Sequence, residues 1–249
     1  MAEPVVLLHG SANGAGSWRT VATALTQAGK EVFCPDLVGY GKAPKASDAY
    51  SIDEEIAHLV AELDRQWIDR FHLVAHSLGS MMGLHARRVL GARVARLTLL
   101  DPVVVSILRV PGEEAALAEM EAQYHRFMDA LPDQAAAARA FVEHWSGPGT
   151  WDVLGDKVHA ILAGLAPKLR VEMTAARTDR TPLSSLAEAP PESTTVVVGE
   201  NTLVAPRAVG RLLAGALGGK TIVVPGARHM LPITHPGAVV EAVLANEPS

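Results

Sequence analysis

The stretch FHLVAHSLG at residues 71–79 decides how the rest of this sequence is interpreted. An apolar run ends at a serine and a helical pattern follows, as at a strand–turn–helix junction. The last five residues differ at one position from G-x-S-x-G, in which the serine occupies a strained turn and acts as a nucleophile. Small residues are needed on both sides of such a turn, and Ala75 and Gly79 provide them. An ordinary serine helix cap is the alternative, which the complete motif in this context disfavours.

Apolar runs and helical patterns alternate on both sides of this motif. Short continuous apolar runs are typical of buried parallel strands, and their alternation with helices indicates a parallel sheet. The predicted strands are residues 5–8, 31–35, 71–75, 94–100, 194–198 and 221–224. The predicted helices include residues 17–28, 78–90, 205–217 and 239–246, and Ser51 with Glu54 predicts a capping box for one more. We therefore expect an α/β fold with about six mostly parallel strands flanked by helices.

The alternation breaks between the fourth and fifth predicted strands. Residues 105–191 contain helical patterns, such as 113–131 and 133–145, without a clear strand. We expect a helical cap inserted into a core formed by residues 1–104 and 192–249. The cap contains large side chains that could line a pocket or form its own core: Tyr124, Phe127, Met128, Trp145 and Trp151.

Composition excludes several classes of protein. The chain has 249 residues, 49% of them hydrophobic, and a net charge of −5 without a basic cluster, so nucleic acid is not an expected partner. No apolar run is long enough for a transmembrane helix. Cys34 is the only cysteine, which excludes a disulfide framework. The N-terminal sequence lacks the pattern of a signal peptide, and we expect a cytoplasmic location.

A nucleophilic serine needs a base and donors for the oxyanion. His229 follows the last predicted strand and is the expected base, whereas His235 precedes Pro236 and is expected to start the last helix. The first predicted strand ends at His9 and Gly10, so the backbone N–H of Ser11 is an expected oxyanion donor together with that of Leu78. The remaining histidines are expected at the surface or in packing.

The chain resembles the α/β-hydrolase superfamily over nearly its whole length. The resemblance rests on LLHGSANGAGSW, DLVGYGKAP, VAHSLGS, LTLLDPV and PGARHMLPITHP, while WSGPGTW resembles bacterial members that have a small helical cap. It implies that Ser77 is the nucleophile and His229 the base. The chain departs from the family pattern in having alanine at position 75 and in lacking the two strands that usually precede the His-Gly motif.

The acid of the triad is the third departure. Many relatives carry it just after the strand that follows the cap, where this chain has Thr202. Asp101 ends the fourth predicted strand, at the sheet edge that carries Ser77, and some relatives place their acid there. Glu200 is the rival candidate, and an incomplete triad is the third possibility. We favour Asp101.

These features predict a serine hydrolase that acts on a small, fairly apolar ester or related acyl substrate without a cofactor. The alternatives are a lyase or C–C bond hydrolase on the same scaffold, similar to hydroxynitrile lyases, and a non-catalytic ligand-binding protein. No metal site is expected. The sequence does not predict the oligomeric state. Four carboxylates of one predicted helix lack a histidine at ligand spacing and are expected on a solvated face: Glu113, Glu114, Glu119 and Glu121.

Overall fold

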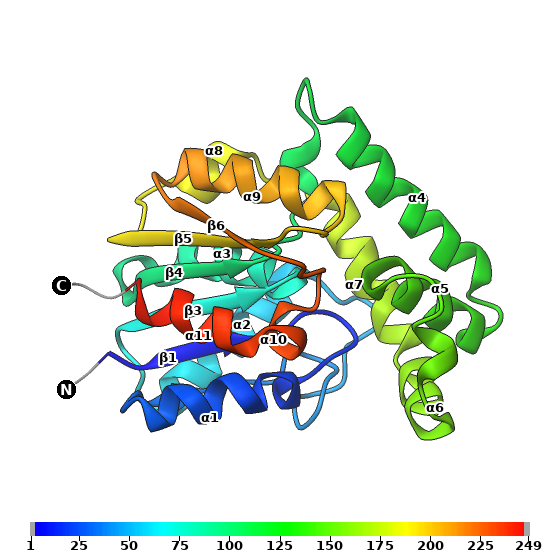
Figure 1. The fold of residues 1–249 in the computed structure, drawn as a ribbon, viewed down its shortest axis with the longest axis horizontal. Helices are drawn as coiled ribbons and strands as arrows, with labels where there is room; N and C mark the ends of the chain where they lie inside the picture. Colours follow the sequence, from blue (N-terminus) through cyan, green and yellow to red (C-terminus); the bar gives the residue numbers. More distant parts are fainter. Residues whose placement is uncertain (1–2, 247–249) are drawn as a thin grey trace.

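Six parallel strands form one sheet in the order β2-β1-β3-β4-β5-β6 in the computed structural model, which describes residues 3–246 (Figure 1). The predicted fold class is therefore confirmed. The strands are β1 (Val5–Leu8), β2 (Val32–Phe33), β3 (Phe71–His76), β4 (Val94–Leu100), β5 (Ser193–Gly199) and β6 (Lys220–Val224). The edge strand β2 is shorter than the predicted residues 31–35. Pro35 has no N–H to donate to a neighbouring strand, which favours an early end.

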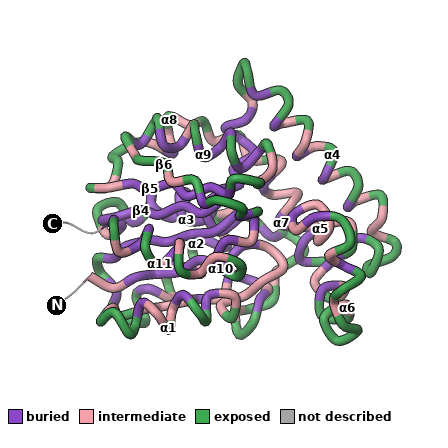
Figure 2. Tube along the Cα trace, in the orientation of Figure 1, coloured by how far each residue is buried: buried purple, intermediate pink, exposed green. Residues whose placement is uncertain are grey.

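Successive residues of each strand point to opposite sides of the sheet, and helices cover both of these faces. Leu73 and Ala75 belong to one hydrophobic core, whereas Val74 belongs to the other. The first core includes residues of α2 (Ile52–Arg65), α3 (Leu78–Leu90) and α9 (Val204–Ala216). The second includes residues of α1 (Arg19–Gln27) and α11 (Pro236–Leu244). Figure 2 shows the central strands buried throughout.

The start of α2 follows from a local capping pattern. The Ser51 hydroxyl accepts a hydrogen bond from the Glu54 N–H at 3.1 Å, as a capping box requires. The Glu54 carboxylate accepts instead from the Ser47 hydroxyl at 2.9 Å. The helix therefore begins at the predicted cap, but the Glu54 carboxylate bonds to the preceding loop instead of completing the capping box.

The segment between β4 and β5 is built from helices joined by loops. Residues 105–191, all of which the structure describes, contain no strand. Helices α4 to α7 lie beyond the carboxyl ends of the strands, while α8 (Leu183–Ala187) packs against α9 (Figure 1). The others are α4 (Glu114–Ala130), α5 (Gln134–Ser146), α6 (Asp156–Gly164) and α7 (Ala166–Thr178). The division into a core at 1–104 and 192–249 and a cap at 105–191 stays a prediction, and residues 1–2 and 247–249 of that core lie outside the described residues.

Shorter helical turns connect these elements. They are the 3-10 turns η1 (Ala15–Trp18), η2 (Gly91–Arg93), η3 (Val105–Leu108) and η4 (Trp151–Val153), and the single-turn helix α10 (Leu231–Thr234). None of the helices between residues 3 and 246 combines the length and the hydrophobicity needed to cross a membrane.

Candidate active site

Ser77 occupies a strained turn between β3 and α3. Its backbone has φ 55° and ψ −125°, in the left-handed half of conformational space that side chains other than glycine rarely adopt. A Cβ atom at Gly79 would lie 2.4 Å from the carbonyl oxygen of His9, and one at Gly10 would lie 2.8 Å from Cβ of Ser77. The loop after β1 therefore packs directly on the turn, and glycine is required at both positions.

His229 lies within hydrogen-bond distance of Ser77. It belongs to the loop that follows β6, and its Nε2 is 2.9 Å from the Ser77 Oγ. The backbone carbonyl of His229 accepts a hydrogen bond from Nε2 of His76 at 2.8 Å, which anchors this loop to the turn. Burial lowers the pKa of His229 to about 3, so the imidazole is neutral and can accept the Ser77 proton.

Asp101 lies on the other side of the His229 ring. Its Oδ2 is 3.7 Å from Nδ1 of His229, slightly beyond a hydrogen bond, and neither atom has a hydrogen-bond partner. The second oxygen, Oδ1, accepts from the Gly199 N–H at 3.1 Å. Burial raises the pKa of Asp101 to about 7, against the opposing effects of the Gly199 N–H and the Thr202 hydroxyl. Ser77, His229 and Asp101 thus come together in the order that a catalytic triad requires.

The rival residues occupy other positions. Thr202 lies close enough to Asp101 for its hydroxyl to lower the pKa of that carboxyl, so the position that carries the acid in many relatives adjoins Asp101. The exposed Glu200 carboxylate accepts from the Gly226 N–H at 2.8 Å. His235 precedes α11, whose first residue is Pro236, and its Nδ1 is 2.9 Å from the Thr234 hydroxyl. Neither Glu200 nor His235 forms a hydrogen bond with Ser77.

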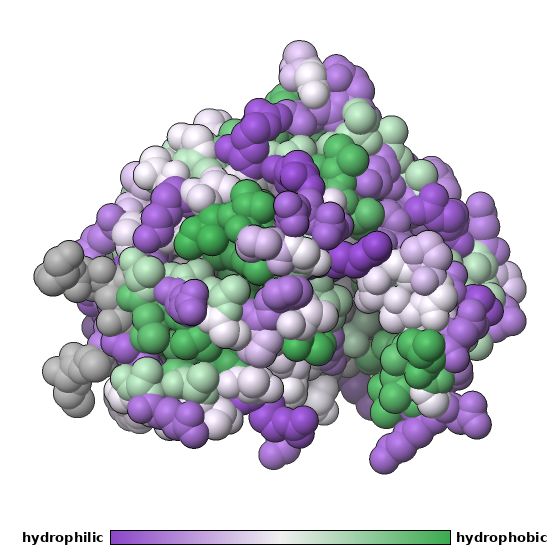
Figure 3. Space-filling view, in the orientation of Figure 1, coloured by the Kyte–Doolittle hydropathy of each residue, from purple (hydrophilic) through white to green (hydrophobic). Residues whose placement is uncertain are grey.

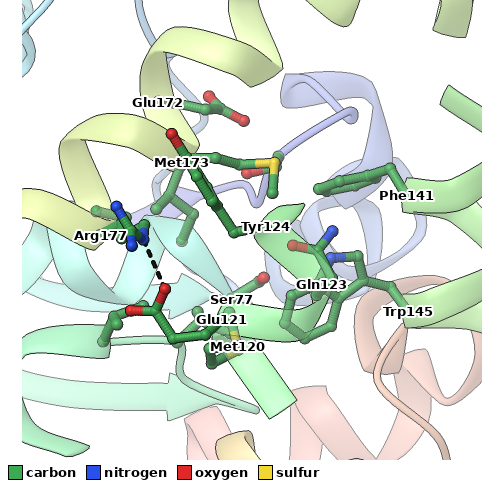
Figure 4. Close-up of a pocket in the computed structure, with 15 residues that line it drawn as sticks. Ser77, Met120, Glu121, Gln123, Tyr124, Phe141, Trp145, Glu172, Met173 and Arg177 are labelled. Atoms are coloured by element: carbon green, nitrogen blue, oxygen red, sulfur yellow. Dashed lines mark hydrogen bonds and ion pairs between the residues drawn. The ribbon is translucent and has the colours of Figure 1, made fainter. Parts of the chain in front are cut away.

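A cavity of about 40 Å³, which we call the serine cavity, opens beside Ser77 (Figure 4). Ser11 and Leu78, the two predicted oxyanion donors, both line it. Most of the remaining lining is apolar and comes from the helical segment: Met120, Tyr124, Phe141, Trp145, Met173 and Ala176. Of the large residues singled out in the sequence, Tyr124 and Trp145 line the cavity. Phe127 is fully buried in the core, Met128 packs against it, and Trp151 stacks on His159 instead.

Trp145 contacts the proposed base directly. Its ring stacks on the imidazole of His229, with ring centroids 4.4 Å apart and planes 30° from parallel. Both rings are buried, so the indole shields this face of His229 from water. The sequence identified Trp145 only as a cap aromatic, because its position over His229 depends on tertiary packing between α5 and the loop after β6.

A buried group of charged side chains lies next to the serine cavity. Lys168 Nζ is 3.3 Å from Glu172 and 3.7 Å from Glu55, and it lies 3.5 Å from the centre of the Tyr50 ring. Glu172 also accepts from the Tyr40 hydroxyl at 2.8 Å, and that hydroxyl accepts from the Ala12 N–H at 3.1 Å. The cluster therefore links α7 to α2 and to the loop that carries Ser11. The only sequence signal for it is the i, i+4 spacing of Lys168 and Glu172.

The expected solvated carboxylate face on α4 and its N-cap residue Glu113 is wrong for three of its four residues. Glu121 lines the serine cavity and pairs with Arg177 at 2.6 Å. Glu119 accepts hydrogen bonds from two N–H groups at the start of α9. Glu113 is buried and forms an ion pair with Arg211. Their partners are distant in sequence, so helical spacing alone could not reveal them. In the part of the chain that the structure describes, no cluster of three metal-ligating side chains is present.

Comparison with known proteins relates this arrangement to one family. The model of the alpha/beta hydrolase family matches residues 5–242. A curated relative, 2-hydroxy-6-oxo-2,4-heptadienoate hydrolase of Pseudomonas putida, is 36% identical over 117 residues, which cover 45% of this chain and 42% of that protein. The match thus spans less than half the length of this relative.

Solved structures share the fold over nearly the whole chain. The bromoperoxidase from Bacillus anthracis has a TM-score of 0.78 at 22% identity, covering 98% of this chain and 91% of that one. A thermophilic esterase from Thermogutta terrifontis has a TM-score of 0.76 at 18% identity, covering 98% and 89%. At these identities the likeness concerns the fold.

Proposed function

The chain belongs to the alpha/beta hydrolase family, and on this basis we propose that it is a serine hydrolase for small, fairly apolar carboxylic esters or related acyl compounds. The observation that carries the proposal is the 2.9 Å contact between Ser77 Oγ and His229 Nε2 on a strained turn. Residues 105–191 serve as a cap that encloses the substrate.

The proposed mechanism begins with the attack of Ser77 Oγ on the substrate carbonyl. His229 Nε2 takes the hydroxyl proton as the new C–O bond forms, and then gives it to the leaving alcohol as the ester C–O bond breaks. Water, activated by the same imidazole, hydrolyses the acyl-enzyme. The positive charge that forms on His229 at each step is stabilised by Asp101, since its free Oδ2 faces the free Nδ1 at 3.7 Å.

The oxyanion is assigned to the backbone N–H groups of Ser11 and Leu78. Both residues line the serine cavity, and the loop that carries Ser11 packs against the Ser77 turn through Gly10. Leu78 begins α3, where the first N–H groups of a helix have no partner within the helix. Such donors stabilise the negative charge that develops on the carbonyl oxygen.

A second candidate is hydrolysis of a carbon–carbon bond. The curated relative from Pseudomonas putida is named for a substrate that carries an oxo group and no ester. The same serine and histidine could serve that chemistry. Turnover of an oxo-dienoate with no turnover of simple esters would favour this candidate.

Labelling by a fluorophosphonate tests the proposal, because the reagent bonds to an activated serine. We expect one label on the wild-type protein, located at Ser77 by peptide mass spectrometry, and none on Ser77→Ala. Ester hydrolysis by Ser77→Ala should fall by about 10⁴-fold or more, since loss of the nucleophile removes the whole triad pathway. Unlabelled Ser77 in folded wild-type protein would contradict the proposal and favour a ligand-binding protein. Ser80→Ala is a matched control: the Ser80 hydroxyl donates to the Ala75 carbonyl and does not line the cavity.

A further inference from the structure

A second, larger cavity lies behind the wall of the serine cavity. This outer cavity has a volume of about 490 Å³ and is formed by α5, α6 and the residues that surround His229. Ser11, Phe141 and Trp145 line both cavities, so they form the wall between them. The proposed function, on which this inference rests, leaves the outer cavity without a role.

The direction of proton transfer relates the outer cavity to the leaving group. His229 must protonate the departing alcohol, so that part of the substrate has to lie on the His229 side of Ser77. Arg228 and Met230, the chain neighbours of His229, line the outer cavity and not the serine cavity. A carbonyl held beside Ser77 would therefore direct its alcohol portion toward the outer cavity and its acyl portion toward the serine cavity.

The chemistry of the outer cavity fits an apolar alcohol. Most of its lining is apolar, including Val142, Leu154, Val158, Leu162, Met230 and Ile233. It contains no carboxylate, and its one charged side chain is the exposed Arg228. Figure 3 shows apolar side chains gathered over the α6 end of the molecule, where Val153 and Ile161 are also exposed.

The wall between the cavities has to move for one substrate to occupy both. Trp145 stacks on His229, and its indole Nε1 is buried without a hydrogen-bond partner, so no polar contact fixes the ring. The residues that follow it include Gly147 and Gly149, with φ of 107° and 78°. Glycine tolerates changes in such backbone angles better than other residues do. Trp145 is therefore held mainly by packing, at the end of α5.

We propose that the outer cavity binds the alcohol portion of the substrate, the serine cavity binds its acyl portion, and the Trp145 side chain moves aside when substrate connects them. The serine cavity is small in this conformation, so the acyl group is short. The preferred substrates are then short-chain acyl esters of larger apolar alcohols.

Two ester series test the proposal: acetates of ethanol, butanol and hexanol, and ethyl esters of butanoic and hexanoic acid. Val158→Trp and Ile233→Trp fill the outer cavity from α6 and from α10. We expect each to lower the kcat/KM ratio of hexyl acetate to ethyl acetate by about tenfold, because single methylene-sized differences in a pocket are worth ~10–200-fold. The ratio of ethyl hexanoate to ethyl acetate should stay within about twofold, since no lining atom of the serine cavity changes. Met173→Trp, which narrows the serine cavity, should give the reverse pattern.

Ile161→Trp is the matched control, because Ile161 lies on α6, is 56% exposed and lines neither cavity. It should change neither ratio. An outer-cavity variant that changes the acyl ratio instead, or changes neither, would overturn the inference while fluorophosphonate still labels Ser77. Absence of labelling at Ser77 in wild-type protein would overturn the proposed function and this inference with it. Thermal unfolding of each variant verifies that it is folded.

Discussion

The sheet core and the helical segment between β4 and β5 contribute different parts of the candidate site. Ser77, His229 and Asp101 come from turns at the carboxyl ends of strands, where backbone contacts hold them. The helical segment contributes side chains such as Trp145 and Met173, which extend from helix surfaces. Under the proposed function, reactivity depends on backbone geometry, and selectivity depends on side chains that can be exchanged without moving Ser77, His229 and Asp101. The expected effects of substitutions follow from this difference.

The largest effect in this comparison is expected for the core residue Asp101. An Asp101→Asn substitution keeps the shape of the side chain and removes the charge that we propose stabilises the His229 cation. We expect kcat to fall by roughly 10⁴-fold, measured on the best ester, with a melting temperature close to that of the wild type. A loss below about tenfold would show that Asp101 is not the acid.

Two neighbouring substitutions sharpen this test. Glu200→Gln should change kcat by less than about threefold, because the Glu200 carboxylate is exposed and bonds to the Gly226 N–H. Thr202→Asp should lower activity, since it places a second carboxylate beside Asp101. A large gain from Thr202→Asp together with a harmless Asp101→Asn would indicate an incomplete triad in the natural protein.

Lys168→Met tests whether the core and the helical segment are stabilised as one unit. The substitution leaves Glu55 of the core and Glu172 of α7 buried without their shared cation. We expect the free energy of unfolding to fall by about 3–5 kcal/mol in urea titrations, the usual consequence of removing one partner of a buried ion pair. The loss should be the same by fluorescence and by circular dichroism, because the cluster joins both regions.

Lys157→Met is the control for that experiment. Lys157 is also a lysine of the helical segment, on α6, but it is exposed. Its replacement should change the free energy of unfolding by less than about 0.5 kcal/mol. Equal losses for both variants would show that removal of positive charge, rather than the buried pair, is responsible.

The activity should also depend on pH through the His229–Asp101 pair. Burial raises the pKa of Asp101 to about 7, so a proton taken up by the pair below this pH neutralises the carboxylate that the reaction needs. We expect kcat/KM to fall about tenfold per pH unit below 7, which is about 100-fold at pH 5. The profile of kcat/KM against pH measures this, and a flat profile from pH 5 to 8 would contradict it.

The raised pKa of Asp101 affects the stability of the fold in the opposite sense to the activity. A carboxyl with a raised pKa binds its proton more tightly in the folded protein than in the unfolded chain. Its contribution to stability is therefore complete below its usual pKa of 3.8 and is lost as the pH rises through 7. Activity and this contribution thus change in opposite directions with pH.

The smallest expected effect is that of Ser51→Ala at the start of α2. The substitution removes the hydroxyl that accepts from the Glu54 N–H and should lower the free energy of unfolding by about 1 kcal/mol. Ester hydrolysis should be unchanged, since no residue of α2 lines the serine cavity. A loss of activity larger than the loss of stability would show that α2 positions reactive groups directly.

The core could be predicted from sequence because its signals are local. Buried parallel strands produce apolar runs, and the crowding around Ser77 requires glycine at position 79, where any Cβ would meet the His9 carbonyl. The predicted boundaries of α3 and β4 agree with the structure at both ends. Ser77 and His229 could be proposed as nucleophile and base because each follows a strand in a recognisable motif.

The helical segment could not be predicted in the same detail. Its helices follow from periodicity, but the stacking of Trp145 on His229 depends on how α5 packs against a loop more than 80 residues away. The partners of Glu113 and Glu121 are Arg211 and Arg177, which no spacing rule connects to them. The choice between Asp101 and Glu200 also stayed open, because it depends on which carboxylate points toward His229.

The placement of Asp101 on β4 affects how this protein could be recombined with its relatives. Ser77 and Asp101, the proposed nucleophile and acid, lie at the ends of neighbouring strands, β3 and β4, and both precede the helical segment along the chain. An exchange of the whole stretch from the end of β4 to the start of β5 would therefore bring in a new specificity module while inheriting both residues from one parent. A single crossover within the helical segment would likewise keep Ser77 and Asp101 together and separate both from His229. In a relative whose acid follows β5, the same crossover would separate the serine from the acid and keep the acid with the histidine.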